Sequence, residues 1–313
     1  MTNAVIVDAV RTAGGRRNGR LKDWHPADLA AHVLKALVER NDLDPALVDD
    51  VVMGCVMQVG EQSLNIGRNA VLAAGWPESV PATTVDRQCG SSQQALHFAA
   101  QGVIAGAYDI AIAAGVEVMT RTPMGASVVK GEMGWPFPPS MQERYADTGL
   151  PPQGIGAEMI ADEYGFSRED LDAFGAESQR RAAQATAEGR FDNEIVPVPV
   201  VIDGETEMHT VDEGIRPDTT LEGLANLKPA FKEDGKVTAG NSSQICDGAA
   251  AVLVMSEEKA AQLGLRARAR FHSFALAGTD PVTMLKGPIP ATTKILERSG
   301  LSIDDIDLFE VNE

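Results

Sequence analysis

The chain has 313 residues, of which 44% are hydrophobic, so it can bury the core of one large domain or two smaller ones. Its 45 acidic residues exceed its 27 basic residues, which gives a formal net charge of -18. This excess argues against nucleic acid or an anionic membrane as the main partner, because both are negatively charged themselves. An anionic small molecule is still compatible, since local Arg and Lys side chains can form a pocket.

Cysteine usage and the apolar segments indicate the compartment. Cys55, Cys89 and Cys246 are widely spaced and form neither a disulfide framework nor a Cys-x-x-Cys zinc pattern, so we expect a reducing, cytoplasmic location and no metal. The N-terminus enters a strand-like stretch at residues 4–7 without the basic region and long apolar core of a signal peptide. The most apolar stretch, residues 103–118, is too short and too polar to span a membrane.

The first third of the chain alternates between two patterns. β-branched and apolar runs predict strands, and Ala-rich amphipathic runs predict helices. Such alternation implies parallel strands with helices packed on the sheet, which is an α/β fold. The expected strands lie near residues 4–9, 50–55, 82–86 and 110–116, and the expected helices near 27–39, 65–74 and 91–105.

The pattern changes after residue 118. Residues 119–155 are rich in Met, Pro and Gly, which indicates an excursion over the surface. A helical region is predicted over 156–188, where Ser167 and Asp170 have the spacing of a capping box.

The sheet pattern returns later. Residues 196–200 are extended by their Val-Pro alternation, and residues 236–255 return to the sheet in a buried-looking apolar run. Residues 119–237 therefore look like an insertion within the first half of the fold.

An internal repeat relates residues 37–51 to residues 295–309 without a gap. The shared Glu-Arg pair and the following Leu align, although chance similarity of two amphipathic segments is the alternative. The repeat predicts a second copy that begins near residue 267 and presents a strand, a helix and a second strand. We expect the apolar side chains of this copy to lack cover: Phe271, Phe274, Ile295, Leu296, Ile306 and Phe309.

Cys89 lies between a β-branched stretch and an Ala-rich helical stretch that Gly90 and Ser91 introduce. A helix N-terminus presents free N–H groups and the positive end of the helix dipole, and both stabilise a thiolate and lower the pKa of a thiol. This is where a chain would place a nucleophile. The alternative is a small buried hydrophobic residue, which is the commonest fate of a free Cys.

Several motifs in the same order extend this interpretation. They are Val10-Arg11-Thr12, Gln88-Cys89-Gly90-Ser91-Ser92, Ala114-Gly115-Val116-Glu117-Val118-Met119, Val237-Thr238-Ala239-Gly240-Asn241-Ser242-Ser243, Asp247-Gly248-Ala249-Ala250-Ala251, Gly287-Pro288-Ile289-Pro290-Ala291 and Glu310-Val311-Asn312-Glu313. In these motifs the chain resembles the thiolase family from end to end.

The resemblance implies a layered αβαβα fold with an inserted loop domain. Residues 1–118 and 238–266 would form the N-terminal half, 119–237 the loop domain that binds coenzyme A, and 267–313 the start of the C-terminal half. The family's Gly-His-Pro and second Cys-x-Gly motifs match nothing in this sequence. We therefore expect a chain truncated at its C-terminus, with an incomplete second half.

The implied chemistry is acyl transfer between coenzyme A thioesters, with Cys89 as nucleophile and no permanently bound cofactor. Family members use a His to activate the nucleophile and a second Cys as base, and neither is matched here. His97 lies about 12 Å along the helix from Cys89 and cannot reach its sulfur. No other His has a motif around it. We expect Cys55 and Cys246 to be buried thiols, and the protein to be a homo-oligomer.

Other site residues carry over from the resemblance one at a time. Asn312 matches an Asn that holds a water in an oxyanion hole, and Ser243 a Ser beside the pantetheine arm. Arg216 matches an Arg near the adenine of coenzyme A, although a solvated loop Arg is the alternative. Met284 matches a Met that lines the acyl pocket. Gln153 departs from the Met of many short-chain thiolases, which puts acetoacetyl-CoA in doubt as the preferred substrate.

Three functions remain open from the sequence. The favoured one is a thiolase that degrades bulkier 3-ketoacyl chains, including steroid side chains, and that is inactive without the missing segment. A non-catalytic coenzyme A binder or partner subunit is the second. A ketoacyl synthase is the third, and the context of residues 247–251 disfavours it.

Overall fold

The computed structural model describes residues 2–312, which form two compact units. Unit 1 comprises Met1–Met133, Gly189–Gly214 and Ile245–Phe271, and unit 2 comprises Gly134–Glu188, Ile215–Gln244 and His272–Glu313. Residues 189–214 belong to unit 1 because β6 (Ile195–Val196) pairs in parallel with the end of β1 (Ala4–Thr12). The extended conformation predicted for residues 196–200 is thereby confirmed in β6 and β7 (Val198–Ile202).

A mixed sheet forms the centre of unit 1, in the order β10-β1-β9-β5-β3-β4. The strands predicted near the N-terminus are confirmed as β1, β3 (Asp50–Gly54), β4 (Ala82–Val85) and β5 (Ile110–Val118), and they run in one direction. The predicted return to the sheet is β9 (Cys246–Ser256), which lies between β1 and β5 and is antiparallel to both.

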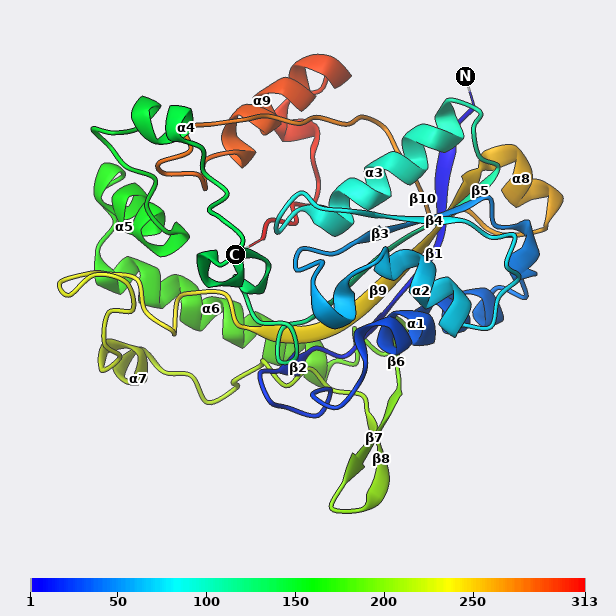
Figure 1. Cartoon of the computed structure of the whole chain (residues 1–313), viewed down its shortest axis with the longest axis horizontal. Helices are drawn as coiled ribbons and strands as arrows, with labels where there is room; N and C mark the ends of the chain where they lie inside the picture. Colours follow the sequence, from blue (N-terminus) through cyan, green and yellow to red (C-terminus); the bar gives the residue numbers. More distant parts are fainter. Residues whose placement is uncertain (1, 313) are drawn as a thin grey trace. The chain divides into compact units, whose positions relative to one another are not determined.

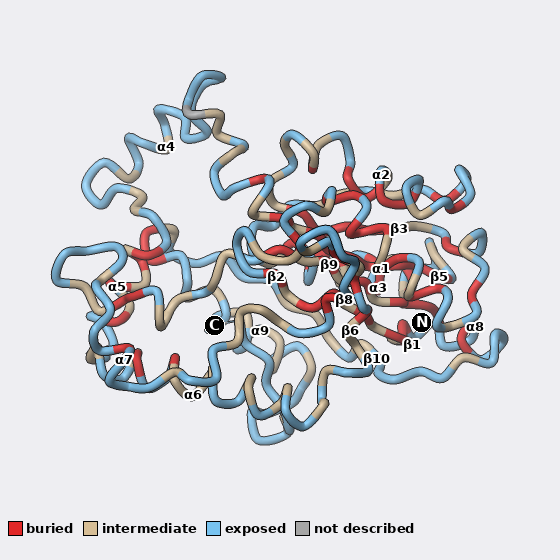
Figure 2. The backbone as a smooth tube through the Cα atoms, turned by 90° about the horizontal axis from the view of Figure 1, so that it is seen from below, coloured by how far each residue is buried: buried red, intermediate tan, exposed pale blue. Residues whose placement is uncertain are grey.

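Helices cover both faces of this sheet (Figure 1). Helix α3 (Ser91–Ile104) lies on one face, and α1 (Pro26–Arg40) and α2 (Ile66–Ala73) pack together on the other. Helix α1 begins where the His25 side chain caps Ala27 N–H, and its apolar residues recur at helical spacing and are buried. The α/β fold class is thus confirmed, with the main core between the sheet and the helices α1 and α2 (Figure 2).

Short elements complete unit 1. The β7–β8 pair forms a separate two-stranded sheet, and β10 adds two residues to the edge of β1. The remaining elements of this unit are β2 (Gly15–Arg16), η1 (Pro45–Leu47), η2 (Gly60–Gln62), η3 (Ala126–Gly131), β8 (Glu205–His209), α8 (Glu257–Gln262) and β10 (Ala269–Arg270).

Unit 2 is built mainly from helices and buries few side chains (Figure 2). The helical region predicted over 156–188 is two helices separated at Gly165, whose φ of 71° ends the first. The capping box of Ser167 and Asp170 is confirmed at the start of the second. The elements are α4 (Pro139–Arg144), α5 (Gln153–Glu163), α6 (Arg168–Ala187), α7 (Leu221–Ala225), α9 (Pro288–Ser299) and η4 (Ile303–Asp305).

The second copy of the repeat is only partly realised. Its helix is α9, but the strand predicted after it is wrong, because no regular structure follows η4 within the described residues. Leu308 is 89% exposed, and α9 buries none of its described residues. A strand needs a neighbouring strand for its N–H and C=O groups, and the described chain provides none here. The first strand of this copy is only the two-residue strand β10, which pairs with β1 of the first copy.

The helices of residues 2–312 include none that combines the length and apolarity needed to cross a membrane.

We predict that the amides of residues 288–312 exchange hydrogen faster than those of β5, because α9 and η4 lack buried apolar contacts whereas β5 is almost entirely buried. We also expect self-association through the exposed apolar side chains of this segment. Hydrogen exchange read by mass spectrometry, together with sedimentation velocity, measures both. Equal protection in a monodisperse sample would show that residues 288–312 are stable as they stand.

Candidate functional site

Cys89 is exposed in a tight turn between β4 and α3. The preceding Gln88 has a φ of 48°, a left-handed conformation that is costly for a residue with a side chain. The Ser91 hydroxyl donates to the Gln88 carbonyl at 2.6 Å and accepts from the Arg87 N–H at 2.9 Å, and Asp86 accepts from the Gln88 N–H at 2.7 Å. These bonds hold the turn, so the position of Cys89 is defined on both sides.

Helix α3 begins directly after this turn, and no described side chain caps its N-terminus. The first N–H groups of a helix have no partner within the helix, and they attract negative charge. Cys89 therefore lies at the start of a helix, as predicted, and not in the core.

Two glycines let the start of α3 approach the sheet. A Cβ at Gly54 of β3 would collide with the Ser92 backbone, and a Cβ at Gly115 of β5 would collide with the Ser92 side chain. Gly54 and Gly115 are neighbours in the parallel ladder, so they form one flat surface under the first turn of α3. The roles of Gly54 and Gly115 could not be predicted from the sequence, because only the fold shows which glycines lie under a helix.

A partly buried polar network supports the ends of the same two strands. The Glu117 carboxylate accepts from Val56 N–H at 2.8 Å, from Met57 N–H at 3.3 Å and from the Gln62 amide at 2.6 Å. Gln62 is fully buried and also accepts from Val118 N–H at 2.9 Å. The network joins the chain after β3 to the end of β5, beside the surface that carries α3.

The three thiols have different surroundings. Burial and the nearby Glu117 raise the pKa of Cys55 to about 12, as fits the predicted buried thiol. The prediction that Cys246 is buried is wrong, because it is exposed at the first position of β9, opposite Arg16 of the two-residue strand β2. The pKa of Cys246 is nevertheless raised, first by partial desolvation and then by Asp247 and Asp212.

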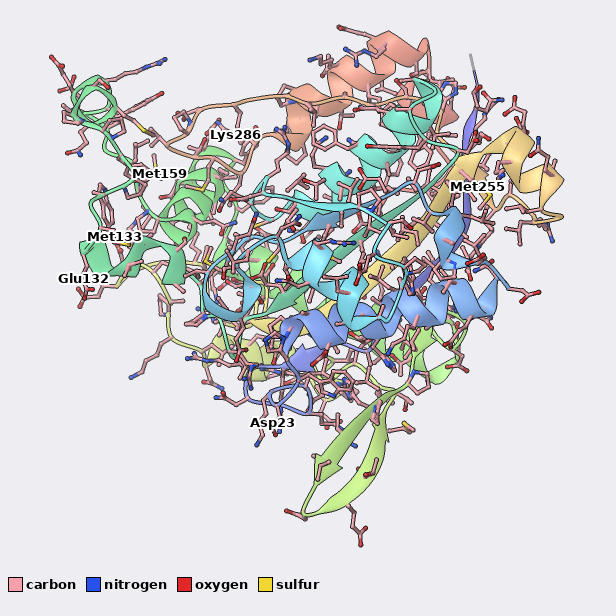
Figure 3. All side chains as sticks on the ribbon, turned by 45° about the vertical axis from the view of Figure 1, so that its right-hand side comes forward. Asp23, Glu132, Met133, Met159, Met255 and Lys286 are labelled. Atoms are coloured by element: carbon pink, nitrogen blue, oxygen red, sulfur yellow. The ribbon has the colours of Figure 1, made fainter. Side chains whose placement is uncertain are left out.

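Unit 2 carries the other predicted site residues. Gln153 is exposed at the first position of α5, and Met284 is 39% exposed with a left-handed φ of 42°. A Cβ at Gly156 of α5 would lie 2.9 Å from the Thr283 carbonyl, so the glycine lets the turn before Met284 sit against this helix. The ion pair of Lys286 with Glu163 at 2.7 Å holds the turn at the other end of α5. Figure 3 labels Lys286.

Ser243 is exposed at the end of a hydrogen-bonded loop. Within the loop, the Asn241 side chain accepts from Thr238 N–H at 2.8 Å and donates to Asp172 of α6 at 3.0 Å. Gly175 of α6 has no Cβ to obstruct the Gly240 carbonyl, which allows the loop to lie close to this helix.

The remaining two residues have less support. Arg216 is exposed, and its backbone N–H donates to Gln179 at 2.7 Å. Asn312 is exposed outside regular structure, and Glu313 of its motif lies outside the described residues.

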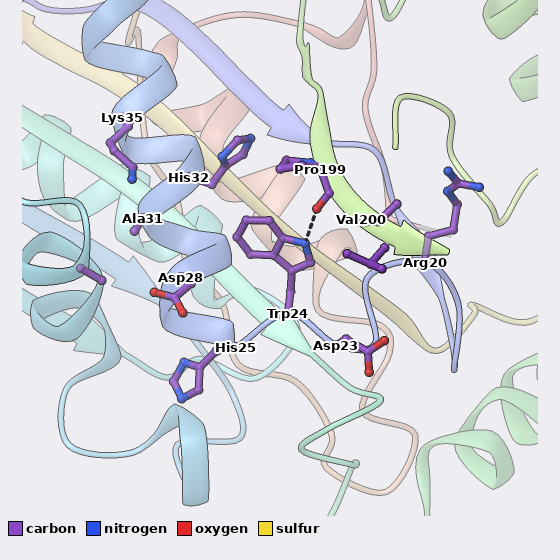
Figure 4. Close-up of a pocket in the computed structure, with 12 residues that line it drawn as sticks. Arg20, Asp23, Trp24, His25, Asp28, Ala31, His32, Lys35, Pro199 and Val200 are labelled. Atoms are coloured by element: carbon purple, nitrogen blue, oxygen red, sulfur yellow. Dashed lines mark hydrogen bonds between the residues drawn. The ribbon is translucent and has the colours of Figure 1, made fainter. Parts of the chain in front are cut away.

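A separate pocket of about 550 Å³ lies in unit 1 between α1 and β7 (Figure 4). Trp24 lines it and donates its indole N–H to the Pro199 carbonyl at 2.9 Å. Its lining mixes Arg20 and Lys35 with Asp23 and Asp28, and it includes none of the site residues predicted from sequence. Residues 2–312 contain no group of three or more His, Cys, Asp or Glu placed to hold a metal ion.

Comparison with known proteins gives the family. Residues 4–258 match the model of the thiolase N-terminal domain, and residues 265–313 match that of the thiolase C-terminal domain. The chain belongs to the thiolase family.

Individual thiolases are similar over the whole chain. The 3-ketoacyl-CoA thiolase of Aliivibrio salmonicida is 49% identical over 100% of this chain and 80% of its own length. The steroid 3-ketoacyl-CoA thiolase FadA6 of Mycobacterium tuberculosis is 46% identical over 100% of this chain and 76% of its own. The crystal structure of Bacillus anthracis acetyl-CoA acetyltransferase matches with a TM-score of 0.88 and 37% identity, over 98% of this chain and 79% of that one.

We predict that iodoacetamide at neutral pH labels Cys89 first, because it is exposed beside a helix N-terminus. Cys55 should be slowest, since it is buried with a pKa near 12. A raised pKa leaves less thiolate at neutral pH, so Cys246 labelling should accelerate as the pH rises towards that pKa. Peptide mapping after timed quenching measures all three rates, and equal neutral-pH rates for Cys89 and either other thiol would contradict this order.

Proposed function

We propose that this thiolase is a 3-ketoacyl-CoA thiolase that uses Cys89 as its nucleophile and coenzyme A thioesters as substrates, with no permanently bound cofactor. The observation that carries the proposal is the exposed Cys89 in a braced turn, directly before a helix whose N-terminus no described side chain caps. The names of the relatives from Aliivibrio and Mycobacterium support the substrate class.

In the cleavage direction, the Cys89 thiolate attacks the 3-keto carbonyl and the bond between the α and β carbons breaks. The electron pair of that bond goes to the departing enolate of acetyl-CoA, which then takes up a proton. The shortened acyl group stays on the Cys89 sulfur. The thiol of coenzyme A then attacks the acyl-Cys and restores the free thiol. Cys suits this exchange because an acyl group has nearly the same free energy on either thiol, and the Cys89 N–H can donate to the oxyanion.

The residues of unit 2 would bind the substrate. In this proposal Ser243 lies beside the pantetheine arm, Arg216 near the adenine end, and Gln153 and Met284 at the acyl chain. Asn312 holds a water in an oxyanion hole. The domain organisation that we propose keeps residues 119–237 as the loop domain, between the parts of the N-terminal half and ahead of the C-terminal half from residue 267.

We expect 3-ketoacyl-CoA to place an acyl group on Cys89, and Cys89→Ser to abolish this because Ser lacks the nucleophilic thiolate. Liquid chromatography and mass spectrometry of the digested protein locate the label, and Cys246→Ser is the matched control that should keep it. A label that persists in Cys89→Ser would contradict the assignment of the nucleophile.

Turnover needs the base and the His that match no position in residues 1–313. We therefore expect a polypeptide with the family's Gly-His-Pro and Cys-x-Gly motifs to raise thiolysis well above that of residues 1–313 alone. The decay of the 3-ketoacyl-CoA enolate absorbance follows the reaction. Full activity of residues 1–313 alone would contradict this expectation, because it would require a different base. Coenzyme A binding without acylation would favour the binder, and a requirement for malonyl-CoA would favour a ketoacyl synthase.

Substrate size follows from Gln153, which stands where many short-chain members have Met. We propose a preference for bulkier 3-ketoacyl chains, including steroid side chains, in line with the name of the Mycobacterium relative. The test compares kcat/KM for acetoacetyl-CoA with kcat/KM for longer or steroid thioesters. It uses this chain together with the polypeptide that carries the Gly-His-Pro and Cys-x-Gly motifs. A higher value for acetoacetyl-CoA would contradict the preference.

A further inference from the structure

Helix α5 contains a buried carboxylate that none of the proposed chemistry uses. Glu158 is only 2% exposed, and its two oxygens accept from the consecutive N–H groups of Lys236 and Val237, each at 2.8 Å. Hydrogen bonds from backbone N–H groups to a carboxylate are stronger than neutral ones, and a buried carboxylate without them would be costly. The segment of residues 235–237 is therefore fixed to α5.

This segment begins the loop that ends at Ser243. After Val237, the Thr238 N–H donates a hydrogen bond to the Asn241 side chain. The Asn241 side chain in turn donates a hydrogen bond to Asp172 of α6. The loop is thus held at its start by α5 and in its middle by α6. A change at Glu158 would remove this attachment to α5, whereas the hydrogen bond from Ala230 N–H to the Val237 carbonyl at 2.9 Å and the attachment of Asn241 to α6 would remain.

The same helix also supports the acyl end of the proposed site. Its first residue is Gln153, and Gly156 lies against the Thr283 carbonyl directly before Met284. Helix α5 therefore links the segments that carry Gln153, Ser243 and Met284, and Glu158 provides its buried polar connection to the Ser243 loop.

We infer that Glu158 is a positioning residue for the coenzyme A site, which it shapes by fixing the segment of residues 235–237 to α5. This inference rests on the proposed function, because the loop matters for binding only if Ser243 contacts the coenzyme. Affinity for coenzyme A then depends on this carboxylate, whereas the reactivity of Cys89 in unit 1 does not.

Gly235 gives an independent way to disturb the same contact. A Cβ at this position would collide with the Glu158 carboxylate, and the φ of Gly235 is not in the left-handed region. Gly235→Ala therefore acts through the contact with Glu158 rather than through backbone strain.

The experiment measures the Kd of coenzyme A by isothermal titration calorimetry on the whole chain. Glu158→Gln keeps the shape but turns an NH₂ group towards a backbone N–H, and we expect Kd to rise about tenfold or more, as it should for Gly235→Ala. Asp162→Asn is the matched carboxylate control, since Asp162 is also on α5 and its carboxylate forms ion pairs with the side chains of Lys232 and Lys236. Gly278→Ala is the matched glycine control, with open space around its Cβ. Both controls should stay within about twofold of the parent.

The rate of Cys89 alkylation by iodoacetamide is the second readout and should be unchanged in every variant. If the parent chain does not bind coenzyme A, the proposed function fails. If the parent binds and Glu158→Gln and Gly235→Ala bind equally well, the positioning role alone is overturned. An equal loss in Asp162→Asn also overturns it, since the surroundings of Lys236 would then matter rather than the backbone contacts. Should Glu158→Gln fail to fold, Gly235→Ala decides.

Discussion

The seating of helix α3 on Gly54 and Gly115 is the contact on which the candidate site depends. Glycine in a strand interior lowers stability by roughly 0.5–1 kcal/mol relative to Ala. The close packing that these two glycines permit must offset this loss. They allow the backbone and side chain of Ser92 to rest directly on the sheet. Because Cys89 lies three residues earlier, any side chain at either glycine would move the nucleophile together with the start of the helix.

Two residues at predicted site positions or next to them have a left-handed backbone conformation. Gln88 precedes Cys89 with a φ of 48°, and Met284 has a φ of 42°. Each such residue costs on the order of 1–2 kcal/mol and persists only where its surroundings hold it. Ser91 and Asp86 hold the first, and Asp280 holds the second, since its carbonyl accepts from Met284 N–H at 2.9 Å. The strain is local, and hydrogen bonds from neighbours in the sequence maintain it.

Local features of this chain could be predicted from the sequence, and distant ones could not. The turn at Cys89, the capping box at Ser167 and the order of the first strands depend on residues near each other in the chain. The place of β9 between β1 and β5 depends on pairing across more than a hundred residues, which no local pattern records. The roles of Glu117 and Glu158 could not be predicted for the same reason. From the sequence alone, an isolated Glu is interpreted as a solvated charge. Only the fold shows which backbone N–H groups donate to it.

The two copies of the repeat separate local from distant causes most clearly. Asp42 and Gly300 occupy equivalent positions after their helices, and both have positive φ, at 47° and 72°. A 3₁₀ turn follows in each copy, at Pro45–Leu47 and at Ile303–Asp305. The copies then diverge, because Val51 is fully buried in β3 whereas its counterpart Phe309 is 63% exposed and outside any strand.

Helix end, left-handed residue and 3₁₀ turn form from their own sequence alone, so they recur wherever that sequence recurs. A strand forms only where neighbouring strands bond its backbone, as β4 and β5 do for β3. Burial of Val51 thus follows from its partners rather than from its own residue type. The equivalent segment near Phe309 has the apolar side chains of a strand but, within residues 2–312, no ladder to join.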